Sequence, residues 1–278
     1  MIIMKKFKVG LQLYSIRDAM KKDMDDALGK VKAMGYDYVE FAGYFGKSAE
    51  EVKALLDKHG LECVSVHQAP SLFWEEGQPA IDFLKTIGAK YCAIPWYTVD
   101  EYKNNWDETM RKFTELGKTM KENGIQLMYH NHDFEFQKID GETIIDRMYA
   151  TIPNDLLKPQ FDTCWIHYAG YDPSEYLRKY TGKIEVVHLK DFVCEKLGGG
   201  PVYGLIDESG AEQKPKSREE SGFKFMPVGY GIQDWKSILA AAEDAGAEIV
   251  IVEQDQSPDR DPLEAAKMSR DYLKTLGL

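Results

Sequence analysis

The side chains best suited to chemistry in this sequence are acids and histidines at the ends of short apolar segments. Four such residues are His130, Asp162, His188 and Glu253. Two carboxylates and two imidazoles suit a divalent metal ion, because carboxylates offset its charge and imidazole adds borderline-soft nitrogen donors. A single histidine or acid in such a place is more often a hydrogen-bonded structural residue or a helix cap. The set of four favours a metal site.

The alternation of side chains along a strand sorts these residues onto faces, because residues two apart share a face. Three faces carry both apolar and ionisable residues: Met128, His130 and His132; Ile184, Val186, His188 and Lys190; and Ile249, Ile251, Glu253 and Asp255. If these faces point inward, apolar layers fill the interior and the polar ends converge above it.

Eight short segments rich in Val, Ile, Tyr, Phe and Leu are predicted to be the strands that position these residues. They span 7–15, 36–41, 61–67, 90–96, 125–132, 157–163, 183–191 and 247–255. The segment 48–60 between two of them is a predicted helix, since it opens with a Ser48–Glu51 capping box and ends at Gly60. Further helices are predicted over 23–35, 75–88, 100–124, 141–151, 172–181, 233–246 and 261–277.

This alternation predicts a single-domain (β/α)8 TIM barrel over residues 1–278. An open doubly wound sheet is the main alternative. Active sites of such barrels lie at the carboxyl ends of the strands, where the acids and histidines stand. The segment 193–227 follows the seventh strand as a loop insertion, for which we expect the role of a lid; a loop for subunit contact is the alternative.

Composition narrows the class of protein. The chain of 278 residues has a net charge of −11, which opposes nonspecific nucleic-acid binding. It has no signal-peptide-like start, and no apolar run approaches the roughly 18 residues of a membrane helix. The four cysteines form no CxxC motif, which indicates a reducing cytoplasm. We therefore expect a cytoplasmic protein with a small-molecule partner, without nucleic acid or membrane; its oligomeric state stays open.

Two short motifs have competing interpretations. GYGIQD at 229–234 resembles the start of a dinucleotide fingerprint. It lacks the third glycine and follows no strand, so we predict a turn before a helix. The tripeptide HNH at 130–132 is too short to indicate a nuclease, and the acidic chain opposes that function.

Six segments together resemble one known family. VGLQLYSIRD, LMYHNHDFEF, FDTCWIHYAG, VVHLKDF, FMPVGYGIQDW and IVEQDQS are similar to segments of the xylose isomerase-like TIM-barrel family of sugar isomerases and epimerases, to which inosose dehydratases are related. The resemblance runs along nearly the whole chain. It implies one divalent metal ion (manganese, cobalt, zinc or magnesium), held by Glu, Asp, His and Glu from strands five to eight.

Three of the four implied ligands carry over, namely Asp162, His188 and Glu253. The fourth departs from the family pattern, because His130-Asn131-His132 stands where the family commonly has ENH. His130 is the natural substitute ligand, and His132 on the same face is the alternative. The epimerases place a metal-bound glutamate on each side of the sugar carbon. Only Glu253 remains here, so that two-glutamate mechanism does not carry over.

The resemblance and the residues together predict a metal-dependent isomerase or epimerase acting on a sugar or keto-sugar. Glu253 is the predicted base for a proton α to a metal-bound carbonyl. His130 or His132 is the predicted opposing acid or base. Lys190 is predicted to contact substrate or a developing oxyanion, with a salt bridge at the barrel mouth as the alternative. Further predicted substrate contacts are Glu40, His67 and Trp165.

Two other functions remain open from the sequence. One is a lyase acting on keto-sugars or keto-inositols, or an enzyme that cleaves 3-keto-glycosides on the same fold. The other is a non-catalytic sugar-binding barrel, in which the altered ligand on strand five weakens metal binding.

Overall fold

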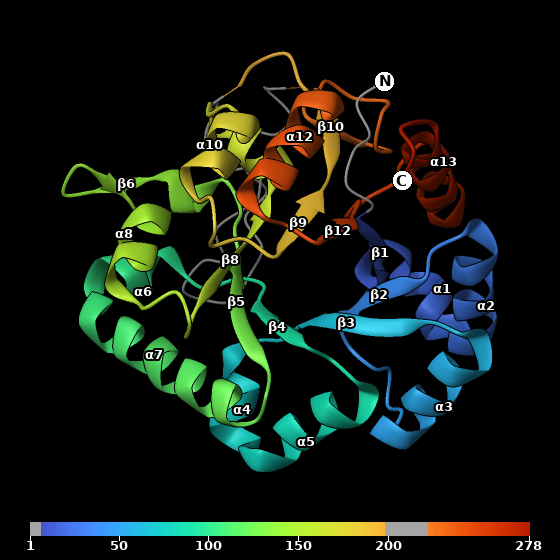
Figure 1. The fold of residues 1–278 in the computed structure, drawn as a ribbon, viewed down its shortest axis with the longest axis horizontal. Helices are drawn as coiled ribbons and strands as arrows, with labels where there is room; N and C mark the ends of the chain where they lie inside the picture. The colour runs from blue at the N-terminus through green and yellow to red at the C-terminus, as the bar shows by residue number, and fades with distance from the viewer. Residues whose placement is uncertain (1–6, 198–221) are drawn as a thin grey trace.

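The computed structural model describes residues 7–197 and 222–278. Eight parallel strands form a closed barrel in the order β1-β12-β9-β8-β5-β4-β3-β2 (Figure 1). The strands are β1 Lys8–Gln12, β2 Tyr38–Phe41, β3 Glu62–His67, β4 Tyr91–Ile94, β5 Gln126–His130, β8 Lys158–Asp162, β9 Val186–Leu189 and β12 Ile249–Val252. The barrel closes where β1 pairs with β12, with Gly10 opposite Ile251. The predicted (β/α)8 barrel is confirmed, and the open doubly wound sheet is wrong.

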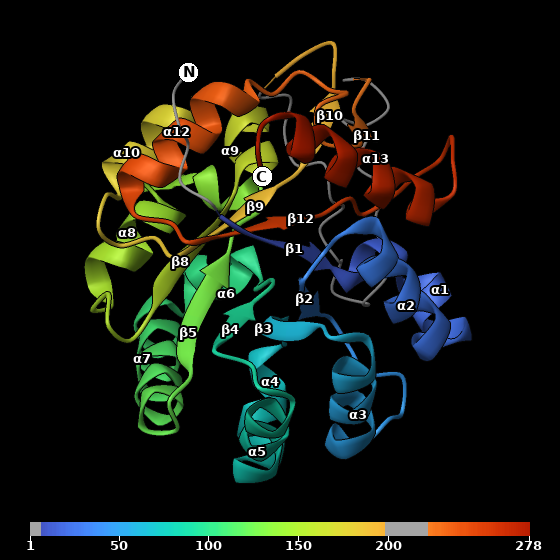
Figure 2. The same ribbon diagram turned by 45° about the vertical axis from the view of Figure 1, so that its right-hand side comes forward.

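Helices surround the barrel, as Figure 2 shows. They are α1 Arg17–Lys22, α2 Met24–Met34, α3 Ala49–His59, α4 Pro70–Glu76, α5 Gln78–Ile87, α6 Val99–Asn104, α7 Trp106–Glu122, α8 Ile144–Thr151, α9 Thr163–Tyr168, α10 Pro173–Lys179, α12 Trp235–Ala245 and α13 Pro262–Thr275. The predicted capping box is present at α3, where Ser48 and Glu51 bond each other's backbone N–H groups and Gly60 ends the helix in the left-handed region. Within the described residues, no helix has the length and apolar character needed to cross a membrane.

Three helix predictions differ from the structure in detail. The segment 75–88 contains a break at Gly77, whose φ of 64° separates α4 from α5. The segment 100–124 is interrupted at Asn105, between α6 and α7. Residues 141–143 belong to a small hairpin of β6 Lys138–Ile139 and β7 Glu142–Thr143, so α8 starts later than predicted.

The two ends of the predicted insertion 193–227 come together. β10 Asp191–Val193 pairs antiparallel with β11 Lys224–Met226. This hairpin joins a buried aromatic cluster formed with α9: Trp165, Tyr168, Phe192, Phe223 and Phe225, with Cys164. Residues 198–221, on which the predicted lid depends, lie outside the described residues.

Asp191 organises the loop that follows this hairpin. Its carboxylate accepts hydrogen bonds from the backbone N–H groups of Gly229 (2.9 Å), Gly231 (3.1 Å) and Gln233 (3.3 Å). It also accepts the indole N–H of Trp235 at 2.8 Å, where α12 starts. The GYGIQD motif is therefore the predicted turn before a helix, held by one buried acid.

The barrel interior confirms the predicted inward faces. One apolar cluster consists of residues from five of the strands: Val64, Ala93, Met128, Val186, Ile249 and Ile251. His130, His188 and Glu253 each follow a member of this cluster by two residues and lie on the same faces. The apolar layer thus supports a polar layer at the carboxyl ends of the strands.

Candidate functional site

The polar layer brings together four residues that lie far apart in the sequence. His130 ends β5, Asp162 ends β8, His188 lies in β9 and Glu253 follows β12. Register pairs Asp162 directly with His188. All four side chains are buried, and one nitrogen or oxygen atom from each lies within 4.8 Å of the others. Within the described residues, this group contains His130 and not His132.

The distances inside this group fit a shared cation. His188 Nδ1 lies 2.9 Å from Glu253 Oε2. His130 Nε2 lies 3.7 Å from Asp162 Oδ2 and 3.9 Å from Glu253 Oε2. Ligands bound to one metal at about 2.0–2.2 Å stand roughly 3–4 Å from one another. The two imidazoles and two carboxylates therefore have both the donor chemistry and the spacing of a divalent metal site.

Asp162 contributes to the site with only one of its oxygens. Its Oδ1 accepts the backbone N–H of Cys164 at 2.8 Å and so caps α9. Its Oδ2 faces His130 and Lys190. One oxygen of Asp162 thus caps a helix, and the other is a candidate metal ligand. Both interpretations of an acid at a strand end apply to this side chain.

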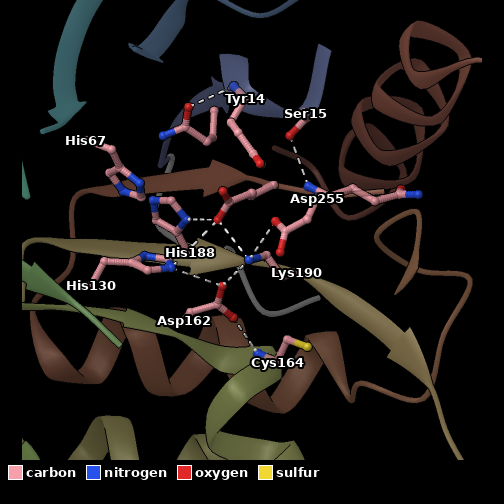
Figure 3. A network of polar contacts seen from close by, with 12 residues as sticks. Tyr14, Ser15, His67, His130, Asp162, Cys164, His188, Lys190 and Asp255 are labelled. Carbon is pink, nitrogen blue, oxygen red and sulfur yellow. Dashed lines mark hydrogen bonds and ion pairs between the residues drawn. The ribbon is translucent and has the colours of Figure 1, made fainter. Parts of the chain in front are cut away.

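Lys190 brings a positive charge into the group. Its Nζ lies 3.0 Å from each of Asp162 Oδ2, Glu253 Oε2 and Asp255 Oδ1 (Figure 3). The same ammonium group lies 5.1 Å from the centre of the Trp165 ring. Lys190 therefore forms ion pairs at the barrel mouth, and it lies beside the candidate ligands. Its contact with substrate stays a prediction, as does that of the fully buried Trp165.

Electrostatics fix the charges of the group. Burial would raise the pKa of Glu253, but the Lys190 ammonium and His188 hold that pKa well below its usual range. Burial raises the pKa of Asp162 to about 6, although Lys190 opposes the rise. Burial would lower the pKa of His188, but the carboxylates of Glu40 and Glu253 raise it to about 10. Glu253 is therefore an anion at neutral pH.

The two histidines of the HNH motif have different surroundings. His130 faces His188, with ring centres 4.6 Å apart. His132 packs against Phe134 and Trp165, with ring centres 5.6 and 5.7 Å apart. Burial lowers the pKa of His132 to about 3 and holds that of His130 well below its usual range. Both rings are therefore neutral near pH 7, and a neutral imidazole has a nitrogen lone pair to offer a metal ion.

Glu40 and His67 adjoin the four-residue group. The Glu40 side chain is fully buried and receives amide N–H groups from Gln12 at 2.7 Å and Gln160 at 2.6 Å. His67 Nε2 lies 2.8 Å from Gln160 Oε1. Sequence reasoning missed both glutamines. The available signal was their position: Gln12 ends β1, and Gln160 shares a face with Asp162.

Comparison with known proteins places the whole chain among related barrels. A family model described as xylose isomerase-like TIM barrel matches residues 28–276. Among curated proteins, an inosose dehydratase of Lacticaseibacillus casei is 26% identical over 280 residues, covering 90% of this chain and 88% of the relative.

Solved structures show the same fold. A sugar phosphate isomerase/epimerase from Parabacteroides distasonis superimposes with a TM-score of 0.76 at 23% identity, covering 97% of this chain and 98% of the other. The IolI protein with a bound zinc atom superimposes with a TM-score of 0.70 at 17% identity, covering 97% of each chain. At these identities the likeness is one of fold.

Proposed function

The chain belongs to the xylose isomerase-like TIM barrel family, and we propose that it is a metal-dependent enzyme that deprotonates a keto-sugar or keto-inositol α to its carbonyl. The observation that carries this proposal is the group of four buried donors within 4.8 Å of one another. The free cysteines, three of them buried, fit the reducing cytoplasm expected from the sequence.

The residues proposed to hold the metal are His130, Asp162, His188 and Glu253. Their mixed nitrogen and oxygen donors suit manganese, cobalt, zinc or magnesium. A bound divalent ion would supply Lewis-acid polarisation of a substrate carbonyl oxygen. The bound zinc of the IolI structure gives fold-level support for a metal in such a barrel.

Glu253 is the proposed base. Glu253 uses Oε2 for its contacts with His130, His188 and Lys190. We propose that its other oxygen, Oε1, receives the substrate proton. The low pKa of Glu253 keeps it ionised at neutral pH, as a base must be.

Lys190 is the proposed acid or oxyanion contact beside that base. Its ammonium group has protons to donate, and it lies 3.0 Å from Glu253 Oε2. A base and an acid side by side suit β-elimination, in which one group takes the α proton and the other protonates the leaving hydroxyl group. Loss of water then produces an unsaturated ketone.

We therefore propose dehydration as the outcome of the reaction. The curated relative that supports this choice is named inosose dehydratase and matches 90% of the chain. Isomerisation or epimerisation is the second candidate. In that reaction Glu253 would return the proton to another carbon, or the predicted acid or base His132 would do so, since His130 Nε2 faces the proposed cation.

A product assay separates these functions. The metal-loaded protein is incubated with inosose and a panel of ketoses and keto-glycosides, and the reaction is followed by proton NMR. A dehydrated product, seen as new vinylic signals or as the methylene signals of its diketone tautomer, supports the dehydratase, and a new epimer or aldose supports the second candidate. If a stoichiometrically metal-loaded protein binds these sugars and changes none of them, the chain is a sugar-binding barrel and the enzymatic proposal is wrong.

A further inference from the structure

A single carboxylate beside the candidate metal ligands contacts two histidine rings at once. Glu40 Oε1 is 2.7 Å from His188 Nε2 and 3.0 Å from His67 Nε2. The two rings stack, with centres 5.2 Å apart and planes at 13° to each other. Glu40 thus connects a candidate ligand to a residue outside the ligand group.

The amide neighbours fix Glu40 as the acceptor in these contacts. The Nε2 atoms of Gln12 and Gln160 both donate to its carboxylate. Gln160 Oε1 consequently faces His67 Nε2. His67 Nε2 therefore lies between two oxygen acceptors and carries a proton. This chain of contacts leaves Glu40 surrounded by donors and held in one orientation.

His188 also contacts Glu40 through Nε2. The carboxylate oxygen lies 2.7 Å from that nitrogen as an ion-pair contact, and its negative charge favours a proton on Nε2. The opposite nitrogen, Nδ1, points to Glu253 Oε2 at 2.9 Å. Nδ1 is thus the atom on the side of the candidate ligands.

We infer that Glu40 is a positioning residue for the metal site: it holds the Nε2 proton of His188 and thereby presents Nδ1 to the cation. Carboxylates commonly orient metal-bound histidines in this way, and their loss costs about 10- to 100-fold in metal affinity. The inference rests on the proposed metal-dependent function and deepens it. It replaces the predicted role of Glu40 as a substrate contact.

The contacts of Glu40 separate these two roles. Its side chain is fully buried. Both Glu40 oxygens already accept amide N–H groups. Glu40 therefore acts through another residue.

The test compares Glu40→Gln with Glu135→Gln. Glu135 is also a fully buried carboxylate, but it bonds Tyr129 Oη and the His132 backbone, both at 2.7 Å, and contacts none of the four candidate ligands. We expect Glu40→Gln to bind Mn²⁺ or Zn²⁺ about 10- to 100-fold more weakly than wild type in chelator competition. Glu135→Gln should keep the wild-type metal affinity, and excess metal should restore turnover of Glu40→Gln.

The ring nitrogens of His188 give a readout that a purely structural role would not change. In ¹⁵N-labelled, metal-loaded wild-type protein, we expect NMR to detect a proton on His188 Nε2 and none on Nδ1, and we expect Glu40→Gln to weaken this preference. Wild-type metal affinity in Glu40→Gln, or a His188 ring protonated only at Nδ1, would overturn the inference. If Glu40→Gln does not fold, the measurement on wild type still decides. A wild-type protein that binds no divalent metal contradicts the proposed function instead.

Discussion

Asp162 carries the central assignment at the scale of single residues. Its Oδ2 belongs to the four-residue group, whereas Oδ1 caps α9. Asp255 offers a comparison, because it contacts the same Lys190 ammonium at 3.0 Å but is not part of the group. Both acids pair with Lys190, but only Asp162 is a proposed metal ligand. Substituting each in turn therefore tests the ligand role apart from the ion pair.

Replacing Asp162 by Ala should abolish stoichiometric metal binding, because the cation loses one of its two anionic ligands. Elemental analysis of the purified, metal-reconstituted protein measures this, with circular dichroism to check the fold. Asp255→Asn is the matched control and should keep one metal per chain. An unchanged metal content in Asp162→Ala would show that the ligand set is wrong.

Glu135 should make stability depend on pH. Burial raises the pKa of Glu135 to about 8 in the folded state, against about 4.3 in an unfolded chain. As pH rises between these values, the unfolded state releases the proton and the folded state retains it, so wild type loses stability. Glu135→Gln does not titrate, and its stability relative to wild type should rise by an amount on the order of a few kcal/mol from pH 5 to pH 8.

Urea unfolding at the two pH values measures this difference. Glu142→Gln, at an exposed position, is the control and should show no such change. A Glu135→Gln difference that is equal at pH 5 and pH 8 would mean that Glu135 is already ionised in the folded protein.

The contacts of an inward-facing residue were harder to predict than its direction. Glu40 and His67 were placed correctly at strand ends, and the alternation of side chains gave inward faces. Their contacts with each other and with the ligand group depend on how the strands are staggered, for example Gln12 opposite Glu40 and a register shift between Val39 and Glu40. Stagger arises when the barrel closes, and a single strand sequence does not contain it.

At the scale of elements, the loop from Gly229 to Trp235 depends on close packing against Asp191. A Cβ on Gly231 would lie 2.1 Å from Asp191 Oδ1 and 2.4 Å from the Phe192 carbonyl oxygen. Both atoms are fixed, one by its hydrogen bonds and the other in the backbone. The sequence predicted the turn from its glycines, but it did not identify Asp191 as the acceptor, because the two segments lie about 40 residues apart.

Gly231→Ala should therefore destabilise the protein by about 3 kcal/mol through overpacking. Thermal and urea unfolding measure the loss. Gly124→Ala is the control, since its φ of 77° strains an alanine but nothing lies within 4 Å of the added Cβ; it should cost only about 1 kcal/mol. Equal effects of the two substitutions would argue against the close contact with Asp191.

At the scale of the whole molecule, barrel closure brings together residues that are more than 100 positions apart. The regular alternation of strands and helices made this predictable, because parallel strands of a barrel present their carboxyl ends on one side. The breaks at Gly77 and Asn105 were missed, although a glycine with a proline two residues later, as at Gly77 and Pro79, is a typical boundary between helices. The pairing of β10 with β11 was also missed, because each strand has only three residues and neither forms part of the barrel.

The central claim is that Glu253 removes a proton α to a substrate carbonyl in a metal-loaded barrel. Solvent exchange tests it most directly: the metal-loaded protein is incubated with inosose and ketoses in D₂O, and deuterium at the α carbon is followed by NMR. We predict exchange with wild type and a rate about 10²–10⁴-fold lower in Glu253→Gln that still contains metal. Wild-type exchange in metal-replete Glu253→Gln, or complete retention of the α hydrogen during wild-type turnover, would contradict the account.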